Sequence, residues 1–135
     1  MLRLVVPLVL IFGVSPMAVS NEDHPILAAV KAKVMDQSKP FTMAVMIKIK
    51  SEHRAAFEAA FHTCIKETRK EKGCIAYDLN RSAEDGNQYV NYERWASVAA
   101  LDAHLKAAHT VKLLATIAPF LDGAPEIKVY LPAGE

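Results

Sequence analysis

The chain has 135 residues, and its 16 Lys and Arg nearly balance its 15 Asp and Glu, for a formal net charge of +1. This balance argues against electrostatic capture of nucleic acid or of an anionic membrane. The length is that of one domain, and no internal repeat or low-complexity segment divides it.

The first 20 residues have the layout of a secretory signal peptide. Arg3 supplies a positive charge, residues 4–14 form an apolar run, and Ala18-Val19-Ser20 offers the small residues that a signal peptidase reads. The alternative is a membrane anchor, but the run is shorter than the roughly 20 apolar residues of a spanning helix. We therefore expect cleavage before Asn21, a secreted or periplasmic protein, and no membrane partner after cleavage.

Residues 21–39 form an extension ahead of the domain, which occupies residues 40–135. A short helix is predicted to begin near Pro25, because apolar residues there follow helical spacing. The residues on this stripe are Ile26, Leu27, Val30 and Val34. We expect the extension to pack on the outside of the domain or to act as a spacer, without chemistry.

The domain begins with a strand and a helix. Alternating apolar residues predict a strand over residues 41–50 that is covered on both sides at its start. A helix is predicted from Ser51, its N-cap, to about Lys72, and Gly73 is the expected C-cap. Cys64 lies in mid-helix and Cys74 opens the next strand. Since that strand runs back along the helix, a disulfide and two buried free thiols both stay open.

Three further strands and a second helical segment complete the domain. The strands are predicted at residues 74–81, 88–95 and 126–131, and a polar hairpin loop joins the first two. Ser97 is the expected N-cap of a helical segment that continues to Ile117. The order strand, helix, strand, strand, helix, strand is the α+β, ferredoxin-like split β-α-β pattern, an antiparallel sheet with helices on one side.

The sheet face without helices must itself be covered. Met43, Val90 and Tyr92 are apolar or aromatic residues that we expect to avoid water there. Pairing of two sheets solves this, so a homodimer through the sheet face is predicted.

Polar and aromatic side chains converge where the third strand turns into the second helical segment. Strand alternation places four of them on one face, and two histidines follow on the helix. They are Tyr89, Asn91, Glu93, Trp95, His104 and His109. Chemistry is expected at this corner. The other histidines, His24, His53 and His62, have no carboxylate or cysteine at ligand spacing, so no metal site is predicted.

Three motifs follow one another along the domain. They are Glu71-Lys72-Gly73-Cys74-Ile75-Ala76-Tyr77, then Tyr92-Glu93-Arg94-Trp95, then Ala100-Leu101-Asp102-Ala103-His104-Leu105 with His109. In these motifs the chain resembles the antibiotic biosynthesis monooxygenase (ABM) domain family, whose members are dimeric ferredoxin-like α/β barrels and include the quinol monooxygenases. The resemblance runs from about residue 41 to residue 131.

The resemblance implies a cofactor-independent monooxygenase that uses O₂ on a small aromatic or quinol-like substrate, without metal, flavin or haem. Asn91 would donate a hydrogen bond to the developing phenolate, and Trp95 would stack on the ring or form the cavity wall. His104 or His109 would accept the phenol proton. Because they are five residues apart on one helical segment, at most one is expected in the cavity. In part of the family a cavity tyrosine stands where this chain has Leu101.

Less specific interpretations stay open beside this one. Trp95 also suits a core position, and the alternative for Glu93 is an ion pair with a neighbour of Arg94 or a salt bridge at the dimer interface. A non-catalytic dimeric barrel that binds a small hydrophobic ligand fits the same fold. Haem binding through His109 is the weaker alternative, because the haem-degrading branch of the family has an Asn in the first strand and residues 41–50 contain none.

Overall fold

The computed structural model describes residues 22–134, and the predicted signal peptide at residues 1–20 lies outside this part. The strands are β1 (Phe41–Lys48), β2 (Cys74–Arg81), β3 (Gln88–Trp95) and β4 (Glu126–Tyr130). The helices are α1 (Pro25–Lys31), α2 (Arg54–Thr68), α3 (Val98–Lys106) and α4 (Ala108–Ile117), with short 3-10 turns at Ser51–His53 and Ala118–Phe120. Among the described residues, no helix is long and apolar enough to span a bilayer.

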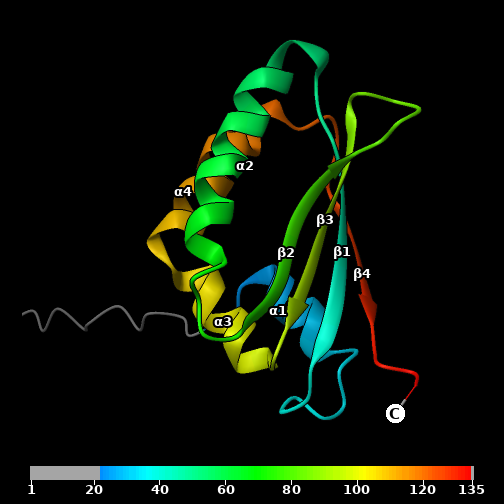
Figure 1. The fold of residues 1–135 in the computed structure, drawn as a ribbon, viewed down its shortest axis with the longest axis vertical. Coiled ribbons are helices and arrows are strands. Elements are labelled where there is room, and N and C mark those ends of the chain that lie inside the picture. Colours follow the sequence, from blue (N-terminus) through cyan, green and yellow to red (C-terminus); the bar gives the residue numbers. More distant parts are fainter. Residues whose placement is uncertain (1–21, 135) are drawn as a thin grey trace, which may run out of the picture.

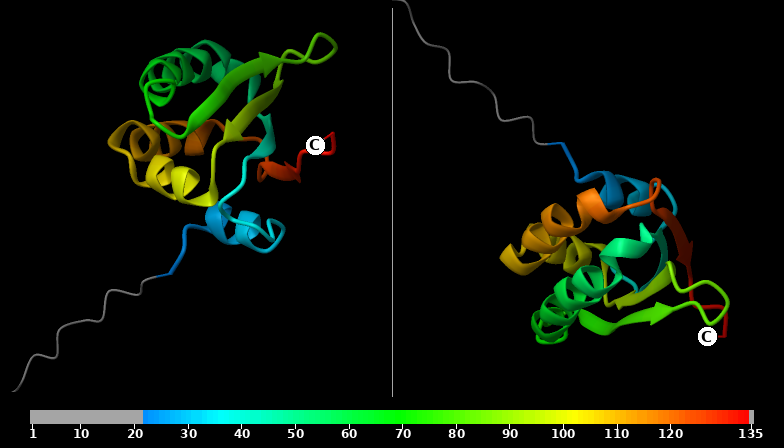
Figure 2. Two further views of the ribbon diagram at one scale, coloured as in Figure 1. Left: turned by 60° about the horizontal axis from the view of Figure 1, so that its bottom comes forward. Right: turned by 90° about the horizontal axis from the view of Figure 1, so that it is seen from above.

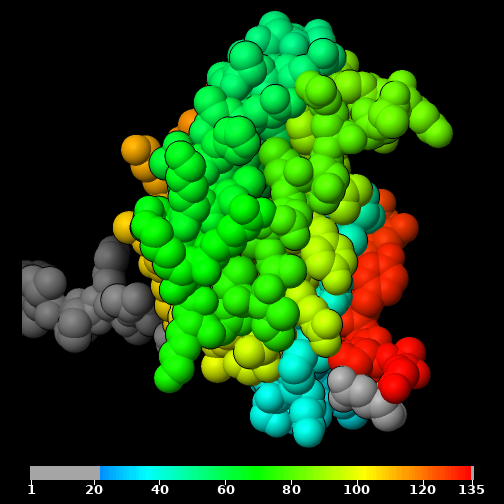
Figure 3. Space-filling view, in the orientation of Figure 1, coloured from blue at the N-terminus to red at the C-terminus, as the bar shows by residue number. Residues whose placement is uncertain are grey.

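The four strands form one antiparallel sheet in the order β2-β3-β1-β4. Helices α2, α3 and α4 lie together on one side of this sheet, as Figure 1 shows, and its other face carries no helix in any view (Figure 2). The hairpin loop between β2 and β3 projects beyond the body of the molecule (Figure 3). The predicted α+β, ferredoxin-like fold is confirmed.

Alternation along β1 directs one row of side chains into the core between sheet and helices. Phe41, Met43, Val45 and Ile47 are all buried, and the intervening residues are not. Met43 is 1% exposed, so its predicted place on the open sheet face is wrong. The open face instead carries Tyr92, which stands across from Ala44 and is 40% exposed.

The predicted boundaries of the first helix differ from the structure at both ends. Ser51 opens the 3-10 turn and is not an N-cap, and α2 ends at Thr68 with Arg69 as its C-cap. Gly73 is therefore not the C-cap. Its backbone instead lies against α3, where a Cβ atom would collide with the side chain of Ala100. The close approach of two elements, and not a helix end, is the reason for glycine here.

The second helical segment is broken. Ser97 caps α3 as predicted, since its Oγ accepts a hydrogen bond of 3.2 Å from the backbone N–H of Ala100. The helix then stops because Ala107 is extended, with ψ of 141°, and α4 starts in a new direction at Ala108.

The two cysteines are free thiols. Cys64 is buried with its Sγ 3.5 Å from the hydroxyl oxygen of Thr68, and Cys74 is half-buried. Burial raises the pKa of both thiols, so neither has the low pKa of a reactive cysteine.

Candidate functional site

A cavity of about 310 Å³ lies between the helices and the sheet. Most of its wall is apolar, and the apolar residues come from β1, β4 and all four helices, or lie beside these elements. These residues are Pro25, Ile26, Met43, Val45, Ile47, Phe61, Leu101, Leu105, Leu113, Leu114, Ile117, Pro125 and Ile127. The volume is at the lower end of the roughly 300–1,000 Å³ typical of ligand pockets, which suits a small molecule.

Five polar side chains complete the wall. They come from β2, β3, α3 and α4, and we call them the polar corner: Tyr77, Asn91, Glu93, His104 and Thr110. All five are buried. An apolar cavity with a few polar groups is the arrangement that binds and orients small organic ligands.

The carboxyl group of Glu93 is held by its two neighbours on the same strand face. The amide Nδ2 of Asn91 donates a hydrogen bond of 2.8 Å to Oε1, and the indole Nε1 of Trp95 donates one of 2.9 Å to Oε2. Burial nevertheless raises the pKa of Glu93 to about 7, because the two hydrogen bonds only partly offset the loss of water and the charge of Glu71 raises it further. Glu93 therefore exchanges a proton near neutral pH. Its predicted salt bridge at a dimer interface is wrong, because it faces the helices.

The amide of Asn91 keeps a free acceptor oxygen beside Glu93. Its Nδ2 is used on the carboxylate, and its Oδ1 is buried without a hydrogen-bond partner. This orientation of the amide follows from the network, since an ionised carboxylate only accepts hydrogen bonds. The free oxygen is therefore suited to accept a hydrogen bond from a hydroxyl group in the cavity. This acceptor role is additional to the predicted donor role, since Nδ2 carries a second N–H.

His104 lines the cavity and is held from three sides. Its Nδ1 lies 2.8 Å from Oε2 of Glu71 and 3.2 Å from the hydroxyl of Thr110, and its ring lies 4.6 Å from that of Trp95 between centroids. Burial lowers the pKa of His104, although the Glu71 carboxylate acts in the opposite direction. His104 is therefore neutral at neutral pH.

His109 does not line the cavity. Its Nε2 lies 3.4 Å from Oε1 of Glu71, close enough for an ion pair but not aligned for a hydrogen bond. The break at Ala107 turns α4 so that His104 and His109 approach the same carboxylate. Only His104 of the two lines the cavity, in agreement with the expectation that at most one does. The reason differs, because the two histidines lie on separate helices and not on two faces of one helix.

Two features of the site were not recognised in the sequence, and a third, Trp95, follows the less specific interpretation. Glu71 lies in the turn after α2, and nothing in the sequence beyond its place in the first motif indicates that it contacts the site. Pro25 and Ile26 of the extension belong to the cavity wall, so α1 is not a mere spacer. Trp95 is fully buried and does not line the cavity, and its indole instead contacts Glu93 and His104.

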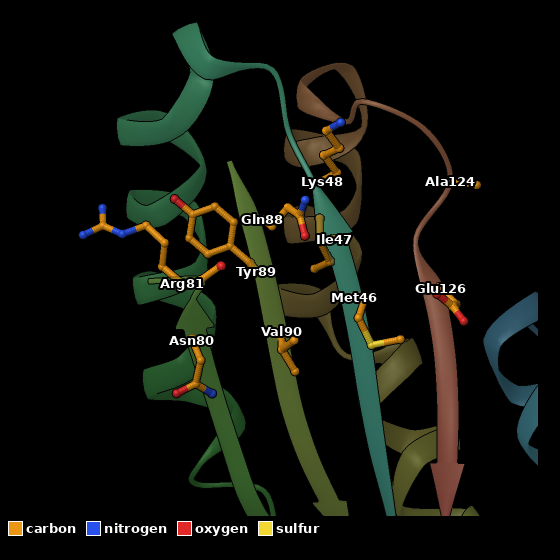
Figure 4. Close-up of a pocket in the computed structure, with 11 residues that line it drawn as sticks. Met46, Ile47, Lys48, Asn80, Arg81, Gln88, Tyr89, Val90, Ala124 and Glu126 are labelled. Carbon is orange, nitrogen blue, oxygen red and sulfur yellow. The ribbon is translucent and has the colours of Figure 1, made fainter. Parts of the chain in front are cut away.

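A second depression, of about 440 Å³, lies at the hairpin end of the sheet. Figure 4 shows its residues on β1, β2, β3, β4 and the segment leading into β4, with Arg81 and Glu126 on opposite sides. Its charged groups do not converge on one point, so the cavity under the helices is the better candidate site.

Comparison with known proteins agrees with this fold. A family model described as "Antibiotic biosynthesis monooxygenase" matches residues 40–115. The protein named "Putative monooxygenase Rv0793" of Mycobacterium tuberculosis is 32% identical over 98 residues, which are 73% of this chain and 96% of that protein. Its solved structure has a TM-score of 0.67 at 31% identity and covers 72% of this chain and 98% of that one. An uncharacterized Synechocystis protein, sll1783, is 31% identical over 67% of this chain, which spans 62% of that relative's length.

The raised pKa of Glu93 predicts a pH-dependent cost in stability. The folded chain keeps the proton up to about pH 7, whereas an unfolded glutamate loses it near its ordinary value of 4.5. The stability that Glu93 contributes is thus fully present below about pH 4.5 and is lost as the pH rises through 7, a loss on the order of 3 kcal/mol. Glu93→Gln should therefore gain stability relative to the parent protein between pH 5 and pH 8, measured by urea unfolding.

The other titratable groups that face or influence Glu93, namely Tyr77, Cys74, His104 and Glu71, are present in both proteins, so their effects cancel in this comparison to first order. Glu84→Gln is the matched control, because Glu84 is exposed. A difference between Glu93→Gln and the parent that stays constant with pH contradicts the raised pKa.

Proposed function

Because the chain belongs to the antibiotic biosynthesis monooxygenase family, we propose that it is a cofactor-independent monooxygenase that oxidises a small phenol or quinol with O₂. One observation carries this proposal: a buried carboxyl group with a pKa of about 7, Glu93, faces an apolar cavity of small-molecule size. Such a group removes a proton from a hydroxyl at neutral pH, and the apolar wall keeps water from the anion that results.

The proposed reaction balances without an external reductant. A hydroquinone and O₂ give a hydroxyquinone and water. One oxygen atom forms a bond to a ring carbon, the other leaves as water, and the substrate supplies all the electrons. The protein has to deprotonate the substrate, hold its anion and admit O₂.

The polar corner supplies these roles in the proposal. The Glu93 carboxylate accepts the phenol proton, and the free Oδ1 of Asn91 accepts a hydrogen bond from a second hydroxyl. Tyr77 stays protonated and is a donor for the anion, because burial first and the charge of Glu93 second raise its pKa well above the ordinary value. We assign the base to Glu93 and not to a histidine, since His104 is held by Glu71 and His109 is outside the cavity.

The test is O₂ uptake with menadiol, corrected for oxidation without protein. Asn91→Ala and Glu93→Gln should each lower kcat/KM by about 10²-fold or more, because one removes a substrate contact and the other the base. The rate of the parent enzyme should rise with pH through about 7 as Glu93 ionises, and Glu93→Gln should lose this rise.

Asn80→Ala and Glu84→Gln are matched controls on exposed positions and should keep full activity. Uptake that is equal in the parent and in Asn91→Ala overturns the enzymatic proposal. Saturable binding of menadione without turnover would favour the second candidate, a non-catalytic barrel for a small hydrophobic ligand, which the same cavity supports.

We also propose that two copies pair through the open sheet face. This face carries the exposed rings of Tyr92 and Tyr130, with half-buried Ala44, Met46 and Val90 between the charged residues. Tyr92→Glu should shift the protein to a monomer in sedimentation velocity by burying a charge in the interface, whereas Tyr92→Phe should stay a dimer. A parent protein that sediments as a monomer contradicts the proposal.

Export is a further proposal that rests on the sequence pattern of residues 1–20. N-terminal sequencing of the protein recovered outside the cytoplasm should begin at Asn21. Retention of Met1 or Leu2 at the N-terminus of this fraction would count against cleavage.

A further inference from the structure

Glu71, His104 and His109 bring three metal-binding groups together beside the polar corner. One donor atom from each lies within 4.8 Å of the other two. The carboxylate lies between the histidines, with Oε2 toward Nδ1 of His104 and Oε1 toward Nε2 of His109. No other group of three His, Cys, Asp or Glu residues comes this close within residues 22–134.

The Nε2 atom of His109 gives an independent reason to look for a ligand. It is a buried nitrogen without a hydrogen-bond partner, although Glu71 lies only 3.4 Å away. A buried polar atom without a partner costs on the order of 1–3 kcal/mol, so it is expected to have a function or a ligand. A metal ion between His109 and Glu71 would satisfy it.

We propose that Glu71, His104 and His109 bind a divalent transition-metal ion of the zinc class. Two imidazoles and one carboxylate are the donor set that Zn²⁺, Co²⁺ and Fe²⁺ favour, whereas Mg²⁺ and Ca²⁺ favour oxygen ligands. Three protein ligands leave a coordination position open for water or another oxygen ligand.

The spacing of the three groups suits this assignment. Donors bound about 2 Å from one ion lie roughly 3.0–3.4 Å apart. The 3.4 Å between Nε2 of His109 and Oε1 of Glu71 already meets this. The 2.8 Å contact of His104 is to the other carboxylate oxygen, Oε2, so binding through a single oxygen requires the carboxylate to rotate. The three donor atoms lie within 4.8 Å of one another, so bringing them to this spacing requires side-chain shifts on the order of 1 Å.

The protein around the site holds the ligands and leaves a path to solvent. The backbone N–H of Glu71 donates to the carbonyl of Thr68, and its carbonyl accepts from the N–H of Cys74, so its turn is fixed on both sides. His104 is 3% exposed, while the side chains of Glu71 and His109 are 19% and 22% exposed. A hydrated ion therefore reaches the site from solvent without passing through the cavity, which Glu71 and His109 do not line.

The test is titration of the tag-free protein with Zn²⁺ by calorimetry, and with Co²⁺ by visible absorption. One ion should bind per chain, with the d–d absorption band of Co²⁺ held by nitrogen ligands. His109→Ala and Glu71→Gln should each weaken the binding by at least tenfold and remove the band. His62→Ala and Glu84→Gln remove the same residue types from exposed positions and should bind as the parent does.

Circular dichroism and thermal unfolding without metal identify any variant that fails to fold, and Glu71→Ala then replaces Glu71→Gln. The proposal is overturned if Zn²⁺ does not bind, if His109→Ala binds as tightly as the parent, or if His62→Ala weakens binding equally, which would indicate adventitious surface sites. The inference goes beyond the proposed oxygenation and does not rest on it. Metal binding is measured without substrate, so the metal-site proposal and the oxygenation proposal can each fail independently of the other.

Discussion

The buried carboxyl group of Glu93 is the constraint around which the cavity is arranged. Moving a carboxylate from water into a protein interior costs several kcal/mol unless donors replace the lost water. Residues two apart on a strand share a face and stand about 6.6 Å apart, so Asn91 and Trp95 reach the carboxyl group from its two sides. Strand β3 lies between β2 and β1, so Glu93 is not at a sheet edge. The remaining cost appears as the raised pKa.

A single backbone turn determines the rest of the polar cluster. If α3 continued through Ala107, His104 and His109 would point about 140° apart around one helix, since five residues turn it by about 500°. The extended Ala107 redirects α4, and both imidazoles then face Glu71. The same turn separates their environments, because His104 lines the cavity and His109 does not. One carboxylate thus contacts a histidine of the proposed reaction chamber and a histidine outside it.

What the sequence predicted depended on local periodicity. The four strands, the Ser97 cap and the fold class follow from alternation, helical spacing and element order, and the structure has them. The errors arose where contacts join distant segments. From the sequence, Gly73 looks like a helix cap, and only the structure shows Ala100 of α3 packed against it. Likewise, no local pattern marks Glu71 as the contact partner of His104 and His109, which lie more than 30 positions away. The interface salt bridge considered for Glu93 is wrong because Asn91 and Trp95 donate to its carboxyl group inside the domain.

The cavity wall is formed partly by residues inside the segment that matches the family model and partly by residues outside it. All five residues of the polar corner fall within residues 40–115, the part that matches the family model. Several apolar residues fall outside it, including Pro25 and Ile26 of α1 and Ile127 of β4. Helix α1 is anchored by Leu27 and Val30, which are at most 1% exposed, so this wall is fixed and not a loose flap. The polar groups proposed for the chemistry are therefore those of the family domain, whereas the shape that selects a substrate depends on segments outside that match. A substrate of one relative is for this reason a poor guide to the substrate of this chain.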